Sequence, residues 1–272
     1  MTSTSEATPG KSRRWHRPPL IKRPLLRWCL WLGAGIYLAI AFGTLEVNWG
    51  RVLEGIPRGQ KFISGFFPPD FVTNIDEIIN GLNESLWMTI TSTVVGIALS
   101  IPIGLGAARN LAPAPVYYFC RSVLAISRSF QEVIVAIFMV KLFGFGPFAG
   151  FITLVIATIG FYGKLLAEDI EDMDPVQAEA VKATGSSWLQ WINYAVQPQV
   201  MPRMIGLGLY RLDINFRESA VLGIVGAGGI GVVLNNAFDQ YDYQTAASVL
   251  LIIIGIVMLV EYSSGYIRKK VQ

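Results

Sequence analysis

The sequence is poor in charge. Only 15% of its 272 residues are Asp, Glu, Lys or Arg, while 53% are hydrophobic and the mean hydropathy is +0.48. Soluble globular domains carry about 25% charged residues. The deficit indicates that lipid, rather than water, surrounds much of the chain.

Cysteine and histidine are also scarce. The two cysteines, Cys29 and Cys120, lie far apart in or beside apolar stretches, and the one histidine, His16, lies in a polar tail. Isolated thiols form neither a disulfide framework nor a zinc site. The sequence therefore predicts a chain without metal or cofactor and excludes a membrane-bound oxidoreductase, which would need cofactor ligands.

Long hydrophobic runs are abundant. The hydrocarbon core of a bilayer is about 30 Å thick, so a helix that crosses it needs roughly 20 mostly apolar residues. Six stretches have this length, although charges interrupt the third and the fifth: residues 25–43, 85–107, 121–140, 147–167, 203–223 and 244–266. The sequence predicts an all-α integral membrane protein with about six transmembrane helices.

The distribution of Lys and Arg predicts the orientation of these helices. With a cytoplasmic amino terminus, fifteen of the 22 Lys and Arg residues fall in inside segments, four in outside segments and three within spans. Cytoplasmic segments are enriched in these residues, so both termini are expected in the cytoplasm. A cleavable signal peptide is the alternative for the first span; the later spans make the chain an integral membrane protein in either case.

The six spans divide the chain into parts. We expect a disordered basic cytoplasmic tail, a first transmembrane helix, an extracytoplasmic loop, a transmembrane core and a short cytoplasmic tail, at residues 1–24, 25–43, 44–83, 84–267 and 268–272.

A glycine-rich string matches a nucleotide-binding pattern by its letters. Gly226-Ala-Gly228-Gly229-Ile-Gly231 satisfies G-x-G-x-x-G, which binds dinucleotides only at the head of a βαβ unit. Only 41 residues follow Gly231, and most of them form the sixth span. We expect Gly226, Gly228, Gly229 and Gly231 to form a turn that uses positive φ angles and close helix packing instead.

The longest predicted cytoplasmic loop, residues 168–202, carries the signals of a short helix. Asp174 is placed to cap its start, Pro175 suits its first position, and Gln177 occupies the capping-box position. Gly185 is placed to end it.

A second short helix is expected directly after the first. It starts at Ser186-Ser187, and Pro198 and Pro202 close it. Two capped helices joined at a glycine form an elbow, which a plain connection between two spans does not need. The elbow either docks a soluble partner or lies on lipid through Trp188 and Trp191.

The elbow resembles the EAA loop of ABC-importer permeases, whose pattern is E-A-A-x₃-G-x₉-I-x-L-P. The matching residues are Glu179, Ala180, Gly185 and Pro198, while Val181, Ala195 and Gln197 depart from it. The string "SAVLGIVGAGGIG" is similar to a segment of the methionine-, sulfonate- and phosphonate-type branch. The strings "FFPPDF" (66–71), "GFGPFAG" (144–150) and residues 198–231 are similar to the phosphonate-import permease.

The resemblance implies a type I ABC importer permease in the membrane of a prokaryote. Such a chain would form a pore with a second permease subunit, as a homodimer, and would dock two separate ATPase subunits through the EAA loop. An extracytoplasmic binding protein would deliver the substrate and would meet the outer loop; no nucleic acid is involved. The residues that would couple to the ATPase are Asp174, Glu179, Ala180, Gly185 and Pro198.

The substrate implied is a phosphonate, with phosphite, sulfonate and methionine as alternatives. An ion-coupled secondary transporter is the alternative from another class, although internal repeats, which are frequent in such proteins, are not evident in this sequence.

Charged and amide side chains inside the predicted spans are candidates for the path of an anion. Intramembrane charge is costly and marks either a pathway or a pair. Helical spacing places Arg121, Arg128 and Glu132 on one face, and Arg211, Asn215 and Glu218 on another, while Asp213 and Arg217 form an i, i+4 pair. The candidates are Arg128, Glu132, Arg211, Asn215, Arg217 and Glu218. The alternative is that these groups neutralise one another and fasten helices together.

Overall fold

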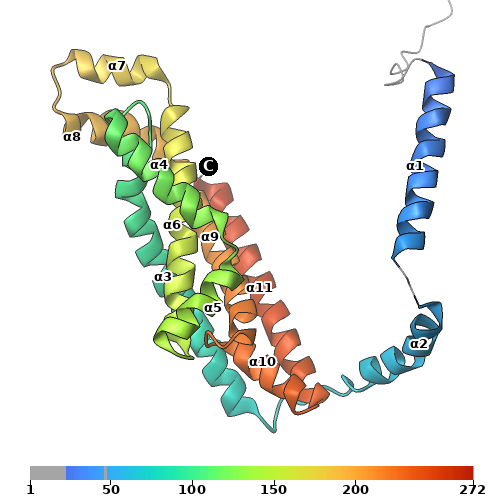
Figure 1. Ribbon diagram of the computed structural model, residues 1–272. Helices are drawn as coiled ribbons and strands as arrows, with labels where there is room; N and C mark the ends of the chain where they lie inside the picture. The colour runs from blue at the N-terminus through green and yellow to red at the C-terminus, as the bar shows by residue number, and fades with distance from the viewer. Residues whose placement is uncertain (1–22, 46–47, 272) are drawn as a thin grey trace, which may run out of the picture. The chain divides into compact units, whose positions relative to one another are not determined.

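The computed structural model describes residues 23–45 and 48–271, with side chains up to residue 266, and this part of the chain consists of helices and connecting turns (Figure 1). It divides into two compact units, the first ending at Lys61 and the second beginning at Phe62. The predicted basic tail, residues 1–24, lies outside the described residues except for Arg23 and Pro24.

The first unit contains one membrane-length helix and most of a second helix. The first predicted span is confirmed as α1 (Pro24–Thr44), which has 21 residues and exposed side chains apart from one intermediate position. The second helix, α2 (Trp49–Ser64), lies where the sequence predicts a loop, and its last three residues belong to the second unit. Part of the predicted extracytoplasmic loop, residues 44–83, is therefore helical.

The second unit is a bundle of long helices with short helices at both ends (Figure 1). Its helices are α3 (Ile75–Gly106), α4 (Ala114–Ser129), α5 (Glu132–Phe143), α6 (Pro147–Glu171), α7 (Pro175–Ala183), α8 (Trp188–Trp191), α9 (Gln197–Ile224), α10 (Ile230–Asp239) and α11 (Tyr243–Val271). The end that carries α7 and α8 is called the elbow end, and the end that carries α10 is called the glycine end.

Four helices in the described part of the chain are long and apolar enough to cross a membrane: Pro24–Thr44, Ile75–Gly106, Pro147–Glu171 and Tyr243–Tyr266. They confirm the first, second, fourth and sixth predicted spans. The second begins ten residues earlier than predicted, so α3 is 32 residues long. The fifth span corresponds to α9, a 28-residue helix whose charged residues lower its hydropathy.

The third predicted span, residues 121–140, is not one helix. It is divided between α4 and α5, which are bent by 92° at a break after Ser129. Phe130 and Gln131 both have extended backbone. Only the two helices together are long and apolar enough to cross a membrane, so they form a broken span or a re-entrant loop.

Small residues bring α3 and α6 into close contact. Ser92, Gly96, Ser100 and Gly104 recur every fourth residue on α3 and are buried, so they form one stripe along it. A side chain at Gly96 would place its Cβ 2.5 Å from the Cβ of Thr158 on α6. Such stripes let membrane helices approach backbone to backbone, and this contact forms the centre of the bundle.

A capped turn connects α2 to α3. Asp70 accepts hydrogen bonds from the Thr73 hydroxyl and from the backbone N–H groups of Val72 (2.8 Å) and Thr73 (3.1 Å). The hydroxyl bond first, and then the two backbone bonds, hold the pKa of the Asp70 carboxyl below its usual value. The Asp70 N–H donates to the Gln244 carbonyl (3.2 Å), which fixes this turn on the start of α11.

Candidate functional site

The first helix of the elbow, α7, forms as its sequence predicts. Asp174 caps it by accepting a hydrogen bond from the Val176 N–H (2.9 Å), and Pro175 occupies its first position. Gly185 follows its end with φ +78°, and its N–H donates to the Lys182 carbonyl (3.0 Å). The capping box predicted for Gln177 is not present in the described part of α7.

The second helix, α8, carries the capping box instead. The Ser187 hydroxyl accepts from the Gln190 N–H, and the Gln190 side chain accepts from the Ser187 N–H (2.9 Å). Trp191 at the end of α8 is buried, and its indole N–H donates to the Ala178 carbonyl of α7 (2.9 Å). The ammonium group of Lys182 lies 4.2 Å from the centre of the same ring. These contacts lock the two helices of the elbow together.

The elbow rests on the bundle through an apolar cluster. Its buried members come from the segment after α3, from α6, from the elbow and from the start of α9, and they are Ala108, Tyr162, Leu166, Ile170, Ala178, Trp191, Ala195, Val196, Val200 and Met204. Polar contacts reinforce this base: Arg203 pairs with Asp169 (2.9 Å), and Arg121 pairs with Glu171 (2.8 Å).

Helical backbone does not end at Pro198, so the prediction that Pro198 and Pro202 end the second helix is wrong. A π-helical turn, Ile192–Val196, follows α8 and runs directly into α9. Pro198 lies in the first turn of α9, directly after the π-helical turn. Pro202 lies inside the same helix. The elbow is therefore joined to α9 by continuous helical backbone.

Several elbow side chains are exposed. Glu179 and Ala180 lie on the outer side of α7. Val176, Trp188 and Leu189 add large apolar surface, because each side chain is more than half exposed. The exposed surface of the elbow thus includes the Glu179 carboxylate and three large apolar side chains.

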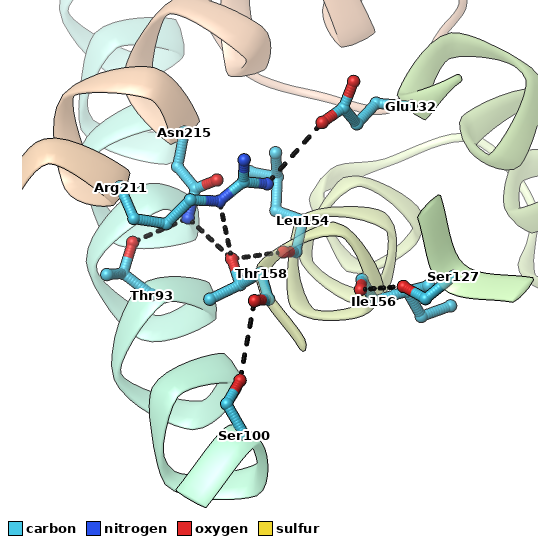
Figure 2. Close-up of polar contacts among 9 residues, drawn as sticks. All are labelled: Thr93, Ser100, Ser127, Glu132, Leu154, Ile156, Thr158, Arg211 and Asn215. Carbon is cyan, nitrogen blue, oxygen red and sulfur yellow. Dashed lines mark hydrogen bonds and ion pairs between the residues drawn. The ribbon is translucent and has the colours of Figure 1, made fainter. Parts of the chain in front are cut away.

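A second candidate site is a buried polar network in the middle of the bundle (Figure 2). Arg211 on α9 is 2% exposed; its Nε donates to the Thr158 hydroxyl (3.2 Å), and its guanidinium lies 3.7 Å from the Glu132 carboxylate. Asn215, one turn further along α9, is fully buried and donates to the hydroxyls of Thr158 (3.1 Å) and Thr93 (2.8 Å). The network joins α3, α5, α6 and α9.

The other predicted pathway residues lie outside this network. The i, i+4 pair of Asp213 and Arg217 is confirmed. Glu218 is half-buried, and Arg128 is exposed. The prediction that Arg121, Arg128 and Glu132 share one helix face is wrong, because α4 ends at Ser129 and Glu132 begins a helix with another direction.

Sequence reasoning missed the threonines of the network. Thr158 accepts from both Arg211 and Asn215, and its hydroxyl donates to the Leu154 carbonyl (2.6 Å). Hydroxyl groups in apolar helices often bond their own helix in this way. The signal in the sequence is a threonine among apolar residues of a span, which is too common to indicate a site.

The glycine string forms the predicted turn between α9 and α10. Gly226, Gly228 and Gly229 have φ angles of +86°, +83° and +82°. A side chain at Gly231 would place its Cβ 1.9 Å from the Ala220 carbonyl oxygen. Positive φ and close approach of backbone therefore explain all four glycines.

The start of α10 is also closed to a phosphate group. The Gly229 N–H donates to the Glu84 carboxylate (3.1 Å), and the Ile230 N–H donates to the Ser85 hydroxyl (2.9 Å). A carboxylate from α3 thus occupies the position that a nucleotide phosphate takes in the dinucleotide fold. The geometry gives no support to nucleotide binding at this turn.

Comparison with known proteins identifies the family. The model of the family described as binding-protein-dependent transport system inner membrane component matches residues 100–272. The phosphite transport system permease protein PtxC of Stutzerimonas stutzeri is 38% identical over 253 residues, which cover 90% of each chain. The phosphate-import permease protein PhnE of Mycolicibacterium smegmatis is 38% identical over 231 residues, which are 85% of this chain but only 43% of that protein.

Solved structures agree on the fold. A chain of the MetNI methionine ABC transporter, from crystals of its inward-facing conformations, superposes with a TM-score of 0.66 at 22% identity, over 74% of this chain and 99% of that chain. An amino acid ABC transporter crystallised with histidines gives a TM-score of 0.62 at 17% identity, over 74% and 98% of the two chains. The chain belongs to the family of binding-protein-dependent transport system inner membrane components, the multi-pass permease subunits of ABC importers.

Proposed function

We propose that this chain forms the membrane pathway of an ATP-driven importer for phosphorus oxyanions, with phosphonates as its main substrates, and that the elbow couples it to separate ATPase subunits. The observation that carries this proposal is the geometry of the elbow. Two capped helices are locked by the bond from Trp191 to Ala178 (2.9 Å) and continue into α9 without a break. A rigid element of this kind transmits a push from a partner directly to a membrane helix.

The exposed surface of the elbow supports docking of a soluble protein. Glu179 offers a carboxylate for polar contact, and the exposed side chains of Val176, Trp188 and Leu189 add apolar surface to the same elbow. Buried aromatic anchors with a polar neighbour are typical of protein interfaces. The coupling residues are Asp174, Glu179, Ala180, Gly185 and Pro198, of which Asp174, Gly185 and Pro198 act by shaping the helices. ATP hydrolysis takes place on the partner chain.

This role sets the orientation of the chain. An ATPase works in the cytoplasm, so the elbow end faces inward and the glycine end faces outward. Both termini then lie in the cytoplasm, in agreement with the excess of Lys and Arg in the predicted inner segments. A second copy of the chain completes the pathway, and an extracytoplasmic binding protein delivers the substrate.

The substrate class rests on the relatives. Two permeases of Stutzerimonas stutzeri named for phosphite, PtxC and HtxC, are 38% and 34% identical to this chain, and PhnE of Mycolicibacterium smegmatis is named for phosphate. A D-methionine permease of Vibrio cholerae is more distant, at 28% identity. The nearer relatives share a tetrahedral phosphorus oxyanion as cargo. Phosphite, sulfonate and methionine are the alternatives to a phosphonate.

The intramembrane charges divide into two groups. Arg211, Asn215 and Glu132 contact one another or shared threonines inside the bundle, so we assign them to fastening helices. Arg128 and Arg217 are exposed on the bundle, and Glu218 is half-buried. These three are assigned to the pathway surface, where water reaches them.

Uptake by the reconstituted importer tests the proposal. The permease is placed in liposomes with its ATPase and binding protein, and uptake of a phosphonate, phosphite, a sulfonate and methionine is measured with and without ATP. The expected result is ATP-dependent uptake of the phosphorus oxyanions. Uptake that needs an ion gradient and no ATP would support a secondary transporter instead and would contradict the proposal.

A further inference from the structure

Three basic side chains meet at a pocket between α4 and α6. The pocket has a volume of about 240 Å³ and is lined by Arg121, Leu124, Ala125, Arg128 and Lys164. Its α4 residues are spaced three, four and seven apart, so they occupy one face of that helix. Only Arg128 of this set was a candidate for the pathway.

Two glycines of α6 bring the basic groups together. A side chain at Gly160 would place its Cβ 2.6 Å from the Ser127 hydroxyl and 2.9 Å from Arg128 Cγ, and one at Gly163 would lie 2.8 Å from Leu124. Because these positions carry no side chain, α4 lies directly against α6. Arg128 and Lys164 consequently line the same pocket.

The pocket carries an uncompensated positive charge. Arg121 is paired with Glu171 (2.8 Å), and Lys164 is paired with Glu168 (3.4 Å). Arg128 is exposed and makes no ion pair or hydrogen bond within the described part of the chain. The three basic side chains therefore have two carboxylate partners, and within the described part of the chain the guanidinium group of Arg128 is the one without a partner.

The depth of Arg128 makes an isolated charge costly. Arg128 follows Arg121 by seven residues, and Lys164 precedes Glu171 by seven, so both lie about 10 Å farther from the elbow end than the Arg121–Glu171 pair. A charge at that depth needs water, a counter-ion or both. Guanidinium groups bind phosphate-like oxyanions through two parallel hydrogen bonds.

We propose that the pocket of Arg121, Arg128 and Lys164 is a transient subsite for a tetrahedral phosphorus oxyanion. The inference rests on the proposed function, since the substrate in transit is one source of such a group. The phosphate of an anionic lipid headgroup is the other source. Two of the three cations keep their carboxylate partners, so the subsite holds its ligand weakly and releases it, as a transport pathway requires.

Ligand-induced stabilisation tests the pocket in the purified full-length protein. Inorganic phosphate and methylphosphonate are compared with chloride at equal ionic strength, and the thermal unfolding midpoint is measured in detergent. The wild type is expected to show an upward shift that Arg128→Gln and Lys164→Gln lose. Lys141→Gln is the matched control, because Lys141 is an exposed lysine in the last turn of α5, away from the pocket residues, and it is expected to keep the shift. Equal shifts in the wild type and Arg128→Gln would overturn the proposal.

A second arm separates the two sources of the oxyanion. The same proteins are placed in nanodiscs of phosphatidylcholine with or without phosphatidylglycerol. Stabilisation by phosphatidylglycerol, without any by free phosphate or methylphosphonate, would make the pocket a lipid site and overturn its role in transit. In the reconstituted importer, Arg128→Gln is expected to lose uptake, while Lys141→Gln retains it. Normal uptake by Arg128→Gln counts against the pocket alone, whereas no ATP-dependent uptake by the wild type counts against the proposed function.

A different observation concerns α2, whose side chains divide into an apolar and a basic face. Trp49, Val52, Leu53, Ile56 and Ile63 follow helical spacing, and their side chains are 48–67% exposed. The opposite face carries Arg51, Glu54, Arg58 and Lys61, with a net charge of +2. An amphipathic helix with a basic polar face is typical of the membrane interface.

The connections of α2 keep it near the bilayer surface. Four residues, 45–48, separate it from the membrane-length helix α1, and four residues span at most about 14 Å. At its other end, the Phe62 ring lies 5.0 Å from that of Tyr243, where the spanning helix α11 begins. Both ends of α2 are thus held at the ends of spans. We propose that α2 lies in the headgroup layer with its apolar face in lipid and its basic face toward anionic headgroups and water.

Depth-dependent quenching tests this placement. A fluorescent label is attached to Leu53→Cys, and to Arg58→Cys as the matched position on the other face, in a Cys29→Ala background that leaves the buried Cys120. In liposomes, lipid brominated near the headgroup is expected to quench the Leu53 label, and an aqueous quencher the Arg58 label. Equal aqueous quenching at both positions would overturn the proposal. So would shielding of Leu53 that appears only when the binding protein is added, because α2 would then be a protein-docking surface.

Discussion

At the residue scale, Arg211 acts as a connection between helices. Its guanidinium joins α9 to α6 through Thr158 and to α5 through Glu132. Its guanidinium carbon also lies 5.4 Å from the centre of the Phe161 ring. A buried cation held on several sides is poorly placed to exchange an anion, so its contribution is to the relative positions of the helices.

Removal of this cation is expected to destabilise the protein. Arg211→Met leaves Glu132 without its partner, and breaking a buried pair from one side costs about 3–5 kcal/mol. For this pair we expect a loss of about 3 kcal/mol or less in the free energy of unfolding, because the Glu132 side chain is 30% exposed. Thermal unfolding in detergent measures the loss. The double variant Arg211→Met/Glu132→Gln should recover part of it, and a double variant as unstable as the single one would contradict the coupling.

Glycine at position 231 is required by the backbone beside it. A Cβ there would lie 1.9 Å from the Ala220 carbonyl oxygen and 2.9 Å from Gly223 Cα. Backbone cannot move aside as a flexible side chain does. The contact of α10 with α9 therefore depends on this residue.

Gly231→Ala is expected to lower the thermal unfolding midpoint and the yield of folded protein, since overpacking costs about 1–3 kcal/mol or more. Gly255→Ala is the control, because Gly255 lies inside α11 with no atom within 4 Å of an added Cβ. Alanine is the better helix former by roughly 0.5–1 kcal/mol, so the control should be neutral or slightly stabilised. Equal effects of the two changes would contradict the packing account.

At the scale of elements, the sequence predicts the features that neighbouring residues determine and misses those that depend on contacts between helices. Four spans follow from apolar length alone, and the start and end of α7 follow from Asp174, Pro175 and Gly185. The bend after Ser129 could not be predicted, because residues 127–131 contain neither proline nor glycine. Contacts across the bundle accompany it, such as the bond from the Ser127 hydroxyl to the Ile156 carbonyl (2.6 Å).

The elbow shows the same division between local features, which the sequence predicts, and tertiary contacts, which it does not. Capping residues predicted its two helices, but the burial of Trp191 depends on Ala178 and on α6, which are not its neighbours in sequence. Pro198 was wrongly expected to end a helix, because a proline in the first turn and one after the last turn look alike in sequence. In the polar network, the spacing of Arg211 and Asn215 placed them on one face, but Thr93 and Thr158 required the structure.

The turn between α7 and α8 is expected to be sensitive to side-chain type. Gly185 has φ +78°, where a β-branched residue is strained, whereas Asn tolerates this conformation. The left-handed region costs an ordinary residue about 1–2 kcal/mol. Gly185→Val should reach the membrane but uncouple uptake from ATP hydrolysis, and Gly185→Asn should retain most uptake. Normal uptake by Gly185→Val in reconstituted vesicles would contradict a role for the bend in coupling.

At the scale of the whole molecule, the candidate sites lie in different regions of the second unit. The elbow end carries an exposed carboxylate and apolar surface, the middle carries the buried network and the basic pocket, and the glycine end carries the tightly packed turn. The helix α9 reaches all three regions, so in the proposed coupling it is the element that would carry a push on the elbow to the network and the glycine turn.

The central claim is that the elbow faces the cytoplasm and contacts an ATPase. Photo-crosslinking in native membranes tests it most directly, with a photoreactive residue at Glu179 and a control at Arg58. The account predicts an adduct between position 179 and a nucleotide-binding protein, identified by mass spectrometry, and none at position 58. An assembled importer without an adduct at 179, or reaction of Glu179→Cys with an impermeant reagent added outside intact cells, would contradict it.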